Sequence, residues 1–302
     1  MGTPDFAVPA LEAILLTEHE VVGVVTATDK MGGRGNKQLI ESDVKKCAMK
    51  HGLRILQPEK FRNEAFLSEL RAINADLQVV VAFRMLPEVV WAMPRLGTIN
   101  VHGSLLPKYR GAAPINWAIM NGERETGVTT FFLRHEIDTG NMILQGKTSI
   151  DENETFGQLY DRMKHIGAAV LVETLQKIAT GDLNGKPQDE RLACPAPKLF
   201  LENTQLDVTK TVAEVHRFVR GLSPHPAAWT TLNGLQLKVF DAKQEIDTPT
   251  SPIGTFVSDH KKYLKIALSD GYLHLLDVQL AGKKRMDIQA FLNGYKDLEA
   301  EI

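Results

Sequence analysis

The most informative part of the sequence is Gly97-Thr98-Ile99-Asn100-Val101-His102-Gly103. It is a short run, rich in β-branched residues, that ends at a glycine, which is typical of a buried strand in a parallel sheet. Side chains alternate along a strand, so Asn100 and His102 lie on one face and their apolar neighbours on the other. Open α/β sheets bind ligands beyond the carboxyl ends of their strands. The polar pair therefore predicts a site at this edge, with a capped strand end as the alternative.

Similar runs before and after this stretch predict an α/β domain with a doubly wound, Rossmann-like parallel sheet. Strands are expected at 20–26, from 53, at 77–82 and at 127–133, and helices at 8–16, 38–51, 62–73 and about 155–180. The opening Gly2-Thr3-Pro4-Asp5-Phe6 is typical of the turn between a first strand and a first helix. We therefore expect either a strand upstream of Met1 or another segment in its place.

A turn-rich stretch after the last of these helices predicts a linker and a second domain. The predicted parts are an α/β domain at 1–185, a linker at 186–203 and a C-terminal domain at 204–302. In the last part a helix at about 209–220 precedes short strands near 228–232, 235–242, 253–258, 264–268 and 272–280. This order indicates a small OB-like β-barrel.

Composition excludes several classes of protein. The chain has 302 residues and a net charge of −2, so contacts with a nucleic acid would need local basic patches. No apolar run reaches the length of a membrane helix and the start is not basic, which indicates a soluble, cytoplasmic protein. Cys47 and Cys194 lie far apart, which argues against a disulfide framework or a structural zinc site. The glycine-rich segments at 32–35 and 140–148 fit neither a dinucleotide fingerprint nor a P-loop.

A third candidate residue is Asp138, in the sequence Glu136-Ile137-Asp138-Thr139-Gly140. This stretch is a predicted turn between the strand at 127–133 and a hairpin-like run at 141–148. Asp-Thr-Gly is common turn chemistry, so a purely structural role is a strong alternative. A contact between Asp138 and His102 would indicate a catalytic role instead.

Several motifs resemble one family of enzymes. The run from Gly97 to Gly111, followed by Ile137-Asp138-Thr139-Gly140, closely resembles the formyltransferases that use 10-formyltetrahydrofolate. The stretches at 2–7, 33–35 and 281–284 resemble the members of that family that act on initiator methionyl-tRNA. Because the motifs are separate, in the same order and spread over almost the whole chain, chance similarity is improbable.

The resemblance implies a catalytic triad and a folate site. Asn100, His102 and Asp138 match the catalytic residues of the family, and the loop residues Ser104, Leu105, Leu106 and Pro107 match its folate-binding loop. The segment Phe83, Arg84 and Met85 would line the pterin pocket. Formyl transfer to an amine passes through a tetrahedral intermediate, whose oxyanion needs a hydrogen-bond donor such as Asn100. His102 would polarise the formyl oxygen and assist proton transfer, supported by Asp138, with no metal.

Two basic clusters could contact the RNA that the resemblance implies as a partner. They are Lys30, Arg34 and Lys37 in a glycine-bearing loop, and Lys283, Lys284 and Arg285 in the C-terminal domain. Such clusters are also common on ordinary solvated faces. A small sugar or nucleotide amine, or water, could replace methionine on tRNA as the acceptor. A non-catalytic RNA-binding protein is the alternative from another class. The protein is expected to be a monomer.

Overall fold

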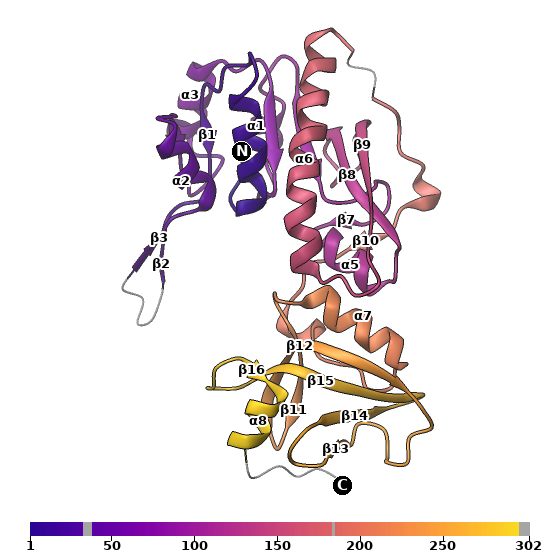
Figure 1. Ribbon diagram of the computed structural model, residues 1–302. Helices are drawn as coiled ribbons and strands as arrows, with labels where there is room; N and C mark the ends of the chain where they lie inside the picture. Colours follow the sequence, from indigo (N-terminus) through magenta and orange to yellow (C-terminus); the bar gives the residue numbers. More distant parts are fainter. Residues whose placement is uncertain (33–37, 183–184, 296–302) are drawn as a thin grey trace. The chain divides into compact units, whose positions relative to one another are not determined.

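Figure 1 shows the computed structural model, which describes residues 1–32, 38–182 and 185–295. The chain forms two compact units. The N-terminal unit contains Met1–Gly111, Gly127–Thr148 and Tyr160–Pro195, and the C-terminal unit contains Ala112–Thr126, Ser149–Leu159 and Ala196–Ile302. Two short segments from before residue 160 thus belong to the C-terminal unit, so no single boundary in the sequence separates the two.

The N-terminal unit is built on a mixed sheet. Its four main strands follow in the order β5 (Gln78–Val81), β6 (Thr98–His102), β8 (Glu125–Phe132) and β9 (Met142–Ser149). β5 runs parallel to β6, whereas β8 runs antiparallel to it. The predicted α/β fold is confirmed, but the sheet is not parallel throughout. β8 is buried along most of its length, and a continuous apolar run does not reveal the direction of a strand.

The first two residues of the chain lie where the sequence lacks a strand. β1 (Val24–Val25) pairs in parallel with β4 (Ile55–Leu56). Met1 and Gly2 run between β1 and β5: the Gly2 N–H donates to Val25 O (3.1 Å), and the Val81 N–H donates to Met1 O (2.9 Å). They therefore link β1 to β5 at this point, in the place expected for a strand.

The four helices predicted for this unit are present, one of them with a different start, and several short elements were not predicted. The helices and short elements of the unit are η1 (Asp5–Ala7), α1 (Val8–Leu15), α2 (Asp43–Lys50), α3 (Glu64–Ile73), α4 (Glu88–Trp91), β7 (Arg110–Gly111), α6 (Phe156–Ala179), η2 (Glu190–Leu192) and β10 (Pro195–Ala196). The helix expected at 38–51 begins only at Asp43, where the Ser42 side chain accepts a hydrogen bond from the Lys45 N–H. The preceding residues form β3 (Gln38–Ile40), which pairs antiparallel with β2 (Lys30–Gly32).

The C-terminal unit packs helices against one antiparallel sheet (Figure 1). Its elements are α5 (Pro114–Met120), η3 (Leu201–Asn203), α7 (Val212–Leu222), β11 (Ala228–Leu232), β12 (Leu235–Ile246), β13 (Phe256–Ser258), β14 (Leu264–Leu268), β15 (Gly271–Leu280), β16 (Met286–Asp287) and α8 (Ile288–Gly294). The strand order is β11-β12-β15-β14-β13, with β16 paired to β15. All five strands expected from the sequence are present.

Local sequence explains where α7 begins. The Thr211 side chain accepts from the Glu214 N–H, and the Glu214 carboxylate accepts from the Thr211 N–H (3.0 Å), which is a capping box. The helix buries Val215, Val219 and Leu222 in the core of the unit. None of the helices in the described ranges is long and apolar enough to span a membrane.

Candidate active site

The two polar residues of β6 lie at the carboxyl end of the sheet, as expected from their spacing. His102 is only 6% exposed, and its ring meets the Phe131 ring edge-on at a centroid distance of 6.4 Å. The opposite face of β6 carries Ile99, which is fully buried, and Val101, which α6 approaches closely at Gly167. A Cβ added at Gly167 would lie 3.3 Å from the Val101 side chain. Dense packing on that face leaves the other face of β6 to carry the polar groups.

Both ring nitrogens of His102 have neighbours. Nε2 lies 2.8 Å from the carbonyl oxygen of Tyr109, and Nδ1 lies 3.7 Å from Oδ2 of Asp138. A carbonyl oxygen can only accept a hydrogen bond, so Nε2 is the nitrogen that carries the proton. When the ring is neutral, the lone pair is therefore on Nδ1, the nitrogen nearer to Asp138. The structure thus brings the His102 ring and the Asp138 carboxylate together.

Asp138 is held in position by backbone contacts. Its Oδ2 accepts a hydrogen bond from the Gly111 N–H (2.8 Å), and its own carbonyl accepts from Nε2 of Gln188 (2.7 Å). Asp138 has a positive φ of 55°, a left-handed conformation that Asp and Asn tolerate better than most residues. The turn thus has the geometry predicted from Asp-Thr-Gly and also directs the carboxylate toward His102.

A second layer of side chains supports this turn. Arg110 donates to the Gln188 side chain and makes two hydrogen bonds of 2.7 Å to the carboxylate of Glu190. These bonds to Glu190 raise the pKa of the Arg110 guanidinium further above its usual range. A guanidinium fixed in a fork by a carboxylate keeps one geometry, so it holds Gln188 where that residue binds Asp138.

The loop after β6 is tied to the neighbouring strands. Oγ1 of Thr129 accepts from the Leu106 N–H (3.0 Å) and donates to the Ser104 carbonyl (2.7 Å). Nε2 of Gln145 donates to the Leu106 carbonyl (2.9 Å) and to Thr129 Oγ1 (3.0 Å). The Ser104 hydroxyl donates to the Lys108 carbonyl (2.6 Å). The loop therefore has a fixed shape before any ligand binds.

The four residues of the predicted folate loop differ in exposure. Ser104, Leu106 and Pro107 are buried, and Leu105 is half-buried, with a side chain close to Gly127. Three of the four residues are thus packed inside the protein and stabilise the loop. The Leu105 side chain and the loop backbone are the parts that a ligand could reach.

Asn100 completes the set of predicted catalytic residues. Its carboxamide is half-buried and, within the part of the chain that the structure describes, has no hydrogen-bond partner. It lies opposite Val80 of β5 and Phe131 of β8, on the same face as His102. Polar groups this close to a core are usually hydrogen-bonded, so a free amide here is available to a ligand.

The predicted pterin segment follows β5 at the same edge of the sheet. Phe83 packs against the apolar cluster that contains Phe61, with ring centroids 5.7 Å apart. The Arg84 guanidinium lies 4.0 Å above the Phe61 ring and donates to the backbone carbonyls of Pro58 and Glu59. Met85 is 77% exposed. Arg84 therefore stabilises the adjacent segment, and Met85 is the member most accessible to a ligand.

The basic residues predicted for RNA contact have different surroundings. Lys30 is exposed on β2, while Arg34 and Lys37 lie outside the described residues. In the C-terminal unit Lys283 and Lys284 are exposed in the turn between β15 and β16. Arg285 is engaged, because it donates to Asp277 (2.6 Å) and stacks 4.2 Å above the Phe240 ring.

One group of potential metal ligands lies elsewhere in the N-terminal unit. Ligand atoms of Glu12, Cys47 and His51 lie within 4.8 Å of one another. The spacing of cysteines could not indicate this group, because Glu12 comes from α1. Burial raises the pKa of the Cys47 thiol, which disfavours the thiolate that metals bind.

Four side chains that position the site escaped sequence reasoning: Arg110, Thr129, Gln145 and Gln188. Thr129 lies opposite His102 in the antiparallel register of β6 and β8. If the register of β6 and β8 were known, it would identify Thr129 as a neighbour of His102. Gln188 acts from an irregular segment and Arg110 from the two-residue strand β7, and neither carries a periodic signal.

A histidine paired with an aspartate, beside a free carboxamide at a sheet edge, is suited to acyl transfer through a tetrahedral intermediate. The protein families that the sequence matches agree with acyl transfer as the class of reaction. Residues 1–175 match the model described as formyl transferase, and residues 198–296 match that of the formyl transferase C-terminal domain. The chain therefore belongs to the formyl transferase family.

Relatives that match over nearly the full length of the chain are more specific than the family. The chain is 50% identical to the methionyl-tRNA formyltransferase of Parabacteroides distasonis, over 99% of this chain and 95% of the relative. It is 48% identical to the methionyl-tRNA formyltransferase of Flavobacterium johnsoniae, over 97% of this chain and 94% of the relative.

Solved structures share the fold at lower sequence identity. WlaRD, a sugar 3N-formyl transferase crystallised with dTDP and 5-N-formyl-THF, matches with a TM-score of 0.65 and 22% identity, over 94% of this chain and 97% of that one. HypX from Aquifex aeolicus in complex with tetrahydrofolic acid matches with a TM-score of 0.61 and 20% identity. That match covers 81% of this chain and 43% of HypX.

Proposed function

We propose that this enzyme transfers the formyl group of 10-formyltetrahydrofolate to the amino group of methionine on initiator methionyl-tRNA, for the initiation of translation. The proposal is supported along nearly the whole chain by relatives named for that reaction. The observation that carries it is the approach of His102 Nδ1 to Asp138 Oδ2, at 3.7 Å, beside the unpaired amide of Asn100. These are the groups that formyl transfer requires.

The reaction needs one bond to form and one to break. The neutral amine attacks the formyl carbon, and the carbonyl oxygen becomes an oxyanion. The Asn100 carboxamide is free to donate to this oxyanion, which is the largest stabilisation that such a site provides. The bond between the carbon and N10 of the folate then breaks, and N10 takes up the proton that the amine has lost.

His102 is suited to move that proton through Nδ1. Its Nε2–H is fixed on the Tyr109 carbonyl, so the lone pair of the neutral ring is at Nδ1. Nδ1 accepts the proton from the attacking amine and returns it to N10. The Asp138 carboxylate, aimed by the Gly111 N–H, stabilises the ring while it is charged.

The remaining residues bind the two substrates. The folate would contact the loop Ser104, Leu105, Leu106 and Pro107 and the segment Phe83, Arg84 and Met85. The tRNA would contact Lys30, Arg34, Lys37, Lys283, Lys284 and Arg285. Exposed lysines suit phosphate contacts that position RNA without reading its sequence.

The C-terminal sheet supports a role in RNA binding. We take it to be an OB-like barrel in a C-terminal domain at 204–302, joined by a linker at 186–203 to a catalytic domain at 1–185. Five strands follow one path, and β12 has register shifts near Asp241 that bend it, as barrel closure requires. The enzyme would act in the cytoplasm as a monomer.

A transfer assay tests the function. The protein is incubated with labelled 10-formyltetrahydrofolate and charged initiator tRNA, with charged elongator methionine tRNA as the matched control. Label should appear on initiator methionine and only weakly on the elongator. Transfer to a sugar or nucleotide amine instead, or release of formate alone, would assign a different acceptor. Tight tRNA binding without transfer would contradict an enzymatic role.

A further inference from the structure

The hairpin of β2 and β3 extends away from α2 and the sheet of the N-terminal unit (Figure 1). Its two strands pair only with each other in the part of the chain that the structure describes. The side chains of both strands are exposed, including those of Met31, Leu39 and Ile40. A two-stranded hairpin without a packed face is marginally stable in water, so its direction must be fixed where it joins the unit.

Lys45 of α2 binds both ends of this hairpin. Asp29 directly precedes β2, and Glu41 directly follows β3. The Lys45 ammonium donates a hydrogen bond to the Asp29 carboxylate and lies 2.8 Å from the carboxylate of Glu41. The Lys45 side chain is only 14% exposed, so these ion pairs are better shielded from water than a pair on the open surface. A single cation therefore joins the two ends of the hairpin to α2.

Lys45 and Asp29 are themselves attached to the body of the unit. The Ser42 hydroxyl accepts from the Lys45 N–H (3.0 Å) and lies 2.7 Å from Oγ1 of Thr26, just after β1. Gln57, which directly follows β4, donates to Oδ1 of Asp29 (2.8 Å) and to the backbone carbonyl two residues before Asp29 (2.7 Å). These bonds connect the base of the hairpin to the pair of β1 and β4, so the ion pairs of Lys45 have a fixed orientation relative to these strands.

The charges at the base of the hairpin also matter for an anionic partner. Lys30, one of the proposed tRNA contacts, is exposed and directly follows Asp29. Without Lys45, two carboxylates would stand at the ends of the hairpin and would repel phosphate groups that approach Lys30. Charges act over about 10 Å at 0.1 M salt, and adjacent residues lie within that distance. Lys45 therefore both orients the hairpin and reduces the negative charge beside Lys30.

We propose that Lys45 is a positioning residue for the tRNA: it binds Asp29 and Glu41 and thereby fixes the direction of the hairpin that presents Lys30 to the phosphates. This inference rests on the proposed function, because it concerns how the enzyme holds its tRNA substrate. The side chain of Lys45 contacts the two ends of the hairpin, and its N–H contacts the cap of α2. Its loss should therefore weaken tRNA binding and leave the chemistry at His102 unchanged.

Steady-state kinetics of three variants test this role. Lys45→Met removes the charge and keeps most of the side-chain length, Lys45→Arg keeps the charge, and Lys46→Met removes a neighbouring exposed charge that pairs with Asp43. With Lys45→Met, KM for initiator methionyl-tRNA should rise about tenfold, while kcat and KM for 10-formyltetrahydrofolate stay within about twofold. Lys45→Arg should recover most of the loss, and Lys46→Met should change KM for the tRNA by less than about twofold. Equal KM values for the tRNA in Lys45→Met and Lys46→Met would overturn the proposal.

A mutant cycle tests whether Lys45 acts through the two carboxylates. In a protein that carries both Asp29→Asn and Glu41→Gln, the hairpin has already lost its ion pairs with Lys45. Adding Lys45→Met to this protein should raise KM for the tRNA by less than about twofold further. A full tenfold rise in this background would show that Lys45 acts on the tRNA by another route, such as direct contact, and would overturn the proposal.

Hydrogen exchange of the free protein measures the effect of Lys45 on the hairpin without any substrate. Amides at 28–32 and 38–41 should exchange faster in Lys45→Met than in Lys46→Met, while the amides of β6 and α6 should not change. Unchanged exchange at the hairpin would overturn the positioning role of Lys45 in an enzyme that does transfer formyl to tRNA. Absence of transfer to methionyl-tRNA by the unchanged enzyme would instead contradict the proposed function, whatever the exchange rates of the hairpin.

Discussion

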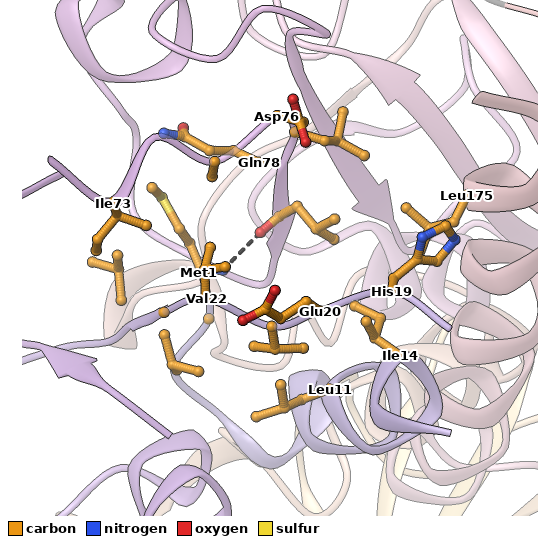
Figure 2. Close-up of a pocket in the computed structure, with 18 of the residues that line it drawn as sticks. Met1, Leu11, Ile14, His19, Glu20, Val22, Ile73, Asp76, Gln78 and Leu175 are labelled. Atoms are coloured by element: carbon orange, nitrogen blue, oxygen red, sulfur yellow. Dashed lines mark hydrogen bonds between the residues drawn. The ribbon is translucent and has the colours of Figure 1, made fainter. Parts of the chain in front are cut away.

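The two ends of the N-terminal sheet differ in how fully their polar groups are used. At the carboxyl end, backbone groups hold His102 and Asp138, side chains hold the loop after β6, and the Asn100 amide has no hydrogen-bond partner among the described residues. At the amino end, strand edges face an apolar cavity around Met1 (Figure 2). Changes at the first end should therefore alter the rate of transfer, and changes at the second should alter stability.

Replacement of His102 by Ala should have the largest effect, a fall in kcat/KM of about 10³-fold, because the proton carrier is lost. The protein should stay folded, since the opposite face of β6 is packed independently. His135→Ala is the matched control, because His135 lies near Asp138 in sequence and its side chain is 89% exposed. If kcat/KM of the His102 variant is within tenfold of that of the unchanged enzyme, His102 takes no part in the chemistry.

Asp138→Asn should reduce kcat/KM by about 10²-fold. The amide oxygen can still accept the Gly111 N–H, so the turn should keep its shape while the charge near His102 disappears. Glu136→Gln, which removes an exposed charge two residues away, should leave the rate within about twofold. If the two variants behave alike in the transfer assay, Asp138 is only a turn residue.

At the other end of the sheet, a chain prepared with Met1 as its first residue has a buried amine, which should make its stability depend on pH. Its pKa is about 5 in the folded protein and near 8 in the unfolded chain, so between these values the unfolded chain binds more protons. The free energy of unfolding should therefore rise with pH, by roughly 2 kcal/mol from pH 6 to pH 8. Urea unfolding at the two pH values measures this.

A chain with four residues added before Met1 supplies the control for that measurement. A protein with four residues before Met1 has an amide at the Met1 nitrogen, so this contribution to the pH dependence should vanish. If both proteins lose the same stability between pH 8 and pH 6, other groups cause the effect.

The comparison also shows what the sequence could predict. Period-two alternation placed Asn100 and His102 on one face of a strand, because that rule needs only local sequence. The turn at Asp138 was predicted too, but its contact with His102 depends on the packing of distant segments. Resemblance to a family suggested the contact, whereas periodicity could not.

Neither the supporting side chains nor the start of α2 could be predicted from the sequence, and the reasons are related. Thr129 and Gln145 act through the register of strands that run antiparallel, and register is a tertiary property. The helical spacing of apolar residues at 38–51 predicts a helix that includes Gln38–Ile40. They instead pair with β2, and the Ser42 cap starts α2 at Asp43.

The smallest effect is expected from Gln145→Ala, which tests whether the fixed loop matters for the chemistry. Nε2 of Gln145 holds both the Leu106 carbonyl and Thr129, so its loss should loosen the loop without removing a reacting group. We expect kcat/KM to fall about tenfold, mainly through a higher KM for the folate, because a loose loop must be ordered on binding. Gln176→Ala, at an exposed position of α6, is the control. A fall in kcat at unchanged KM would instead place Gln145 in the transfer step, and no change would mean that Thr129 alone holds the loop.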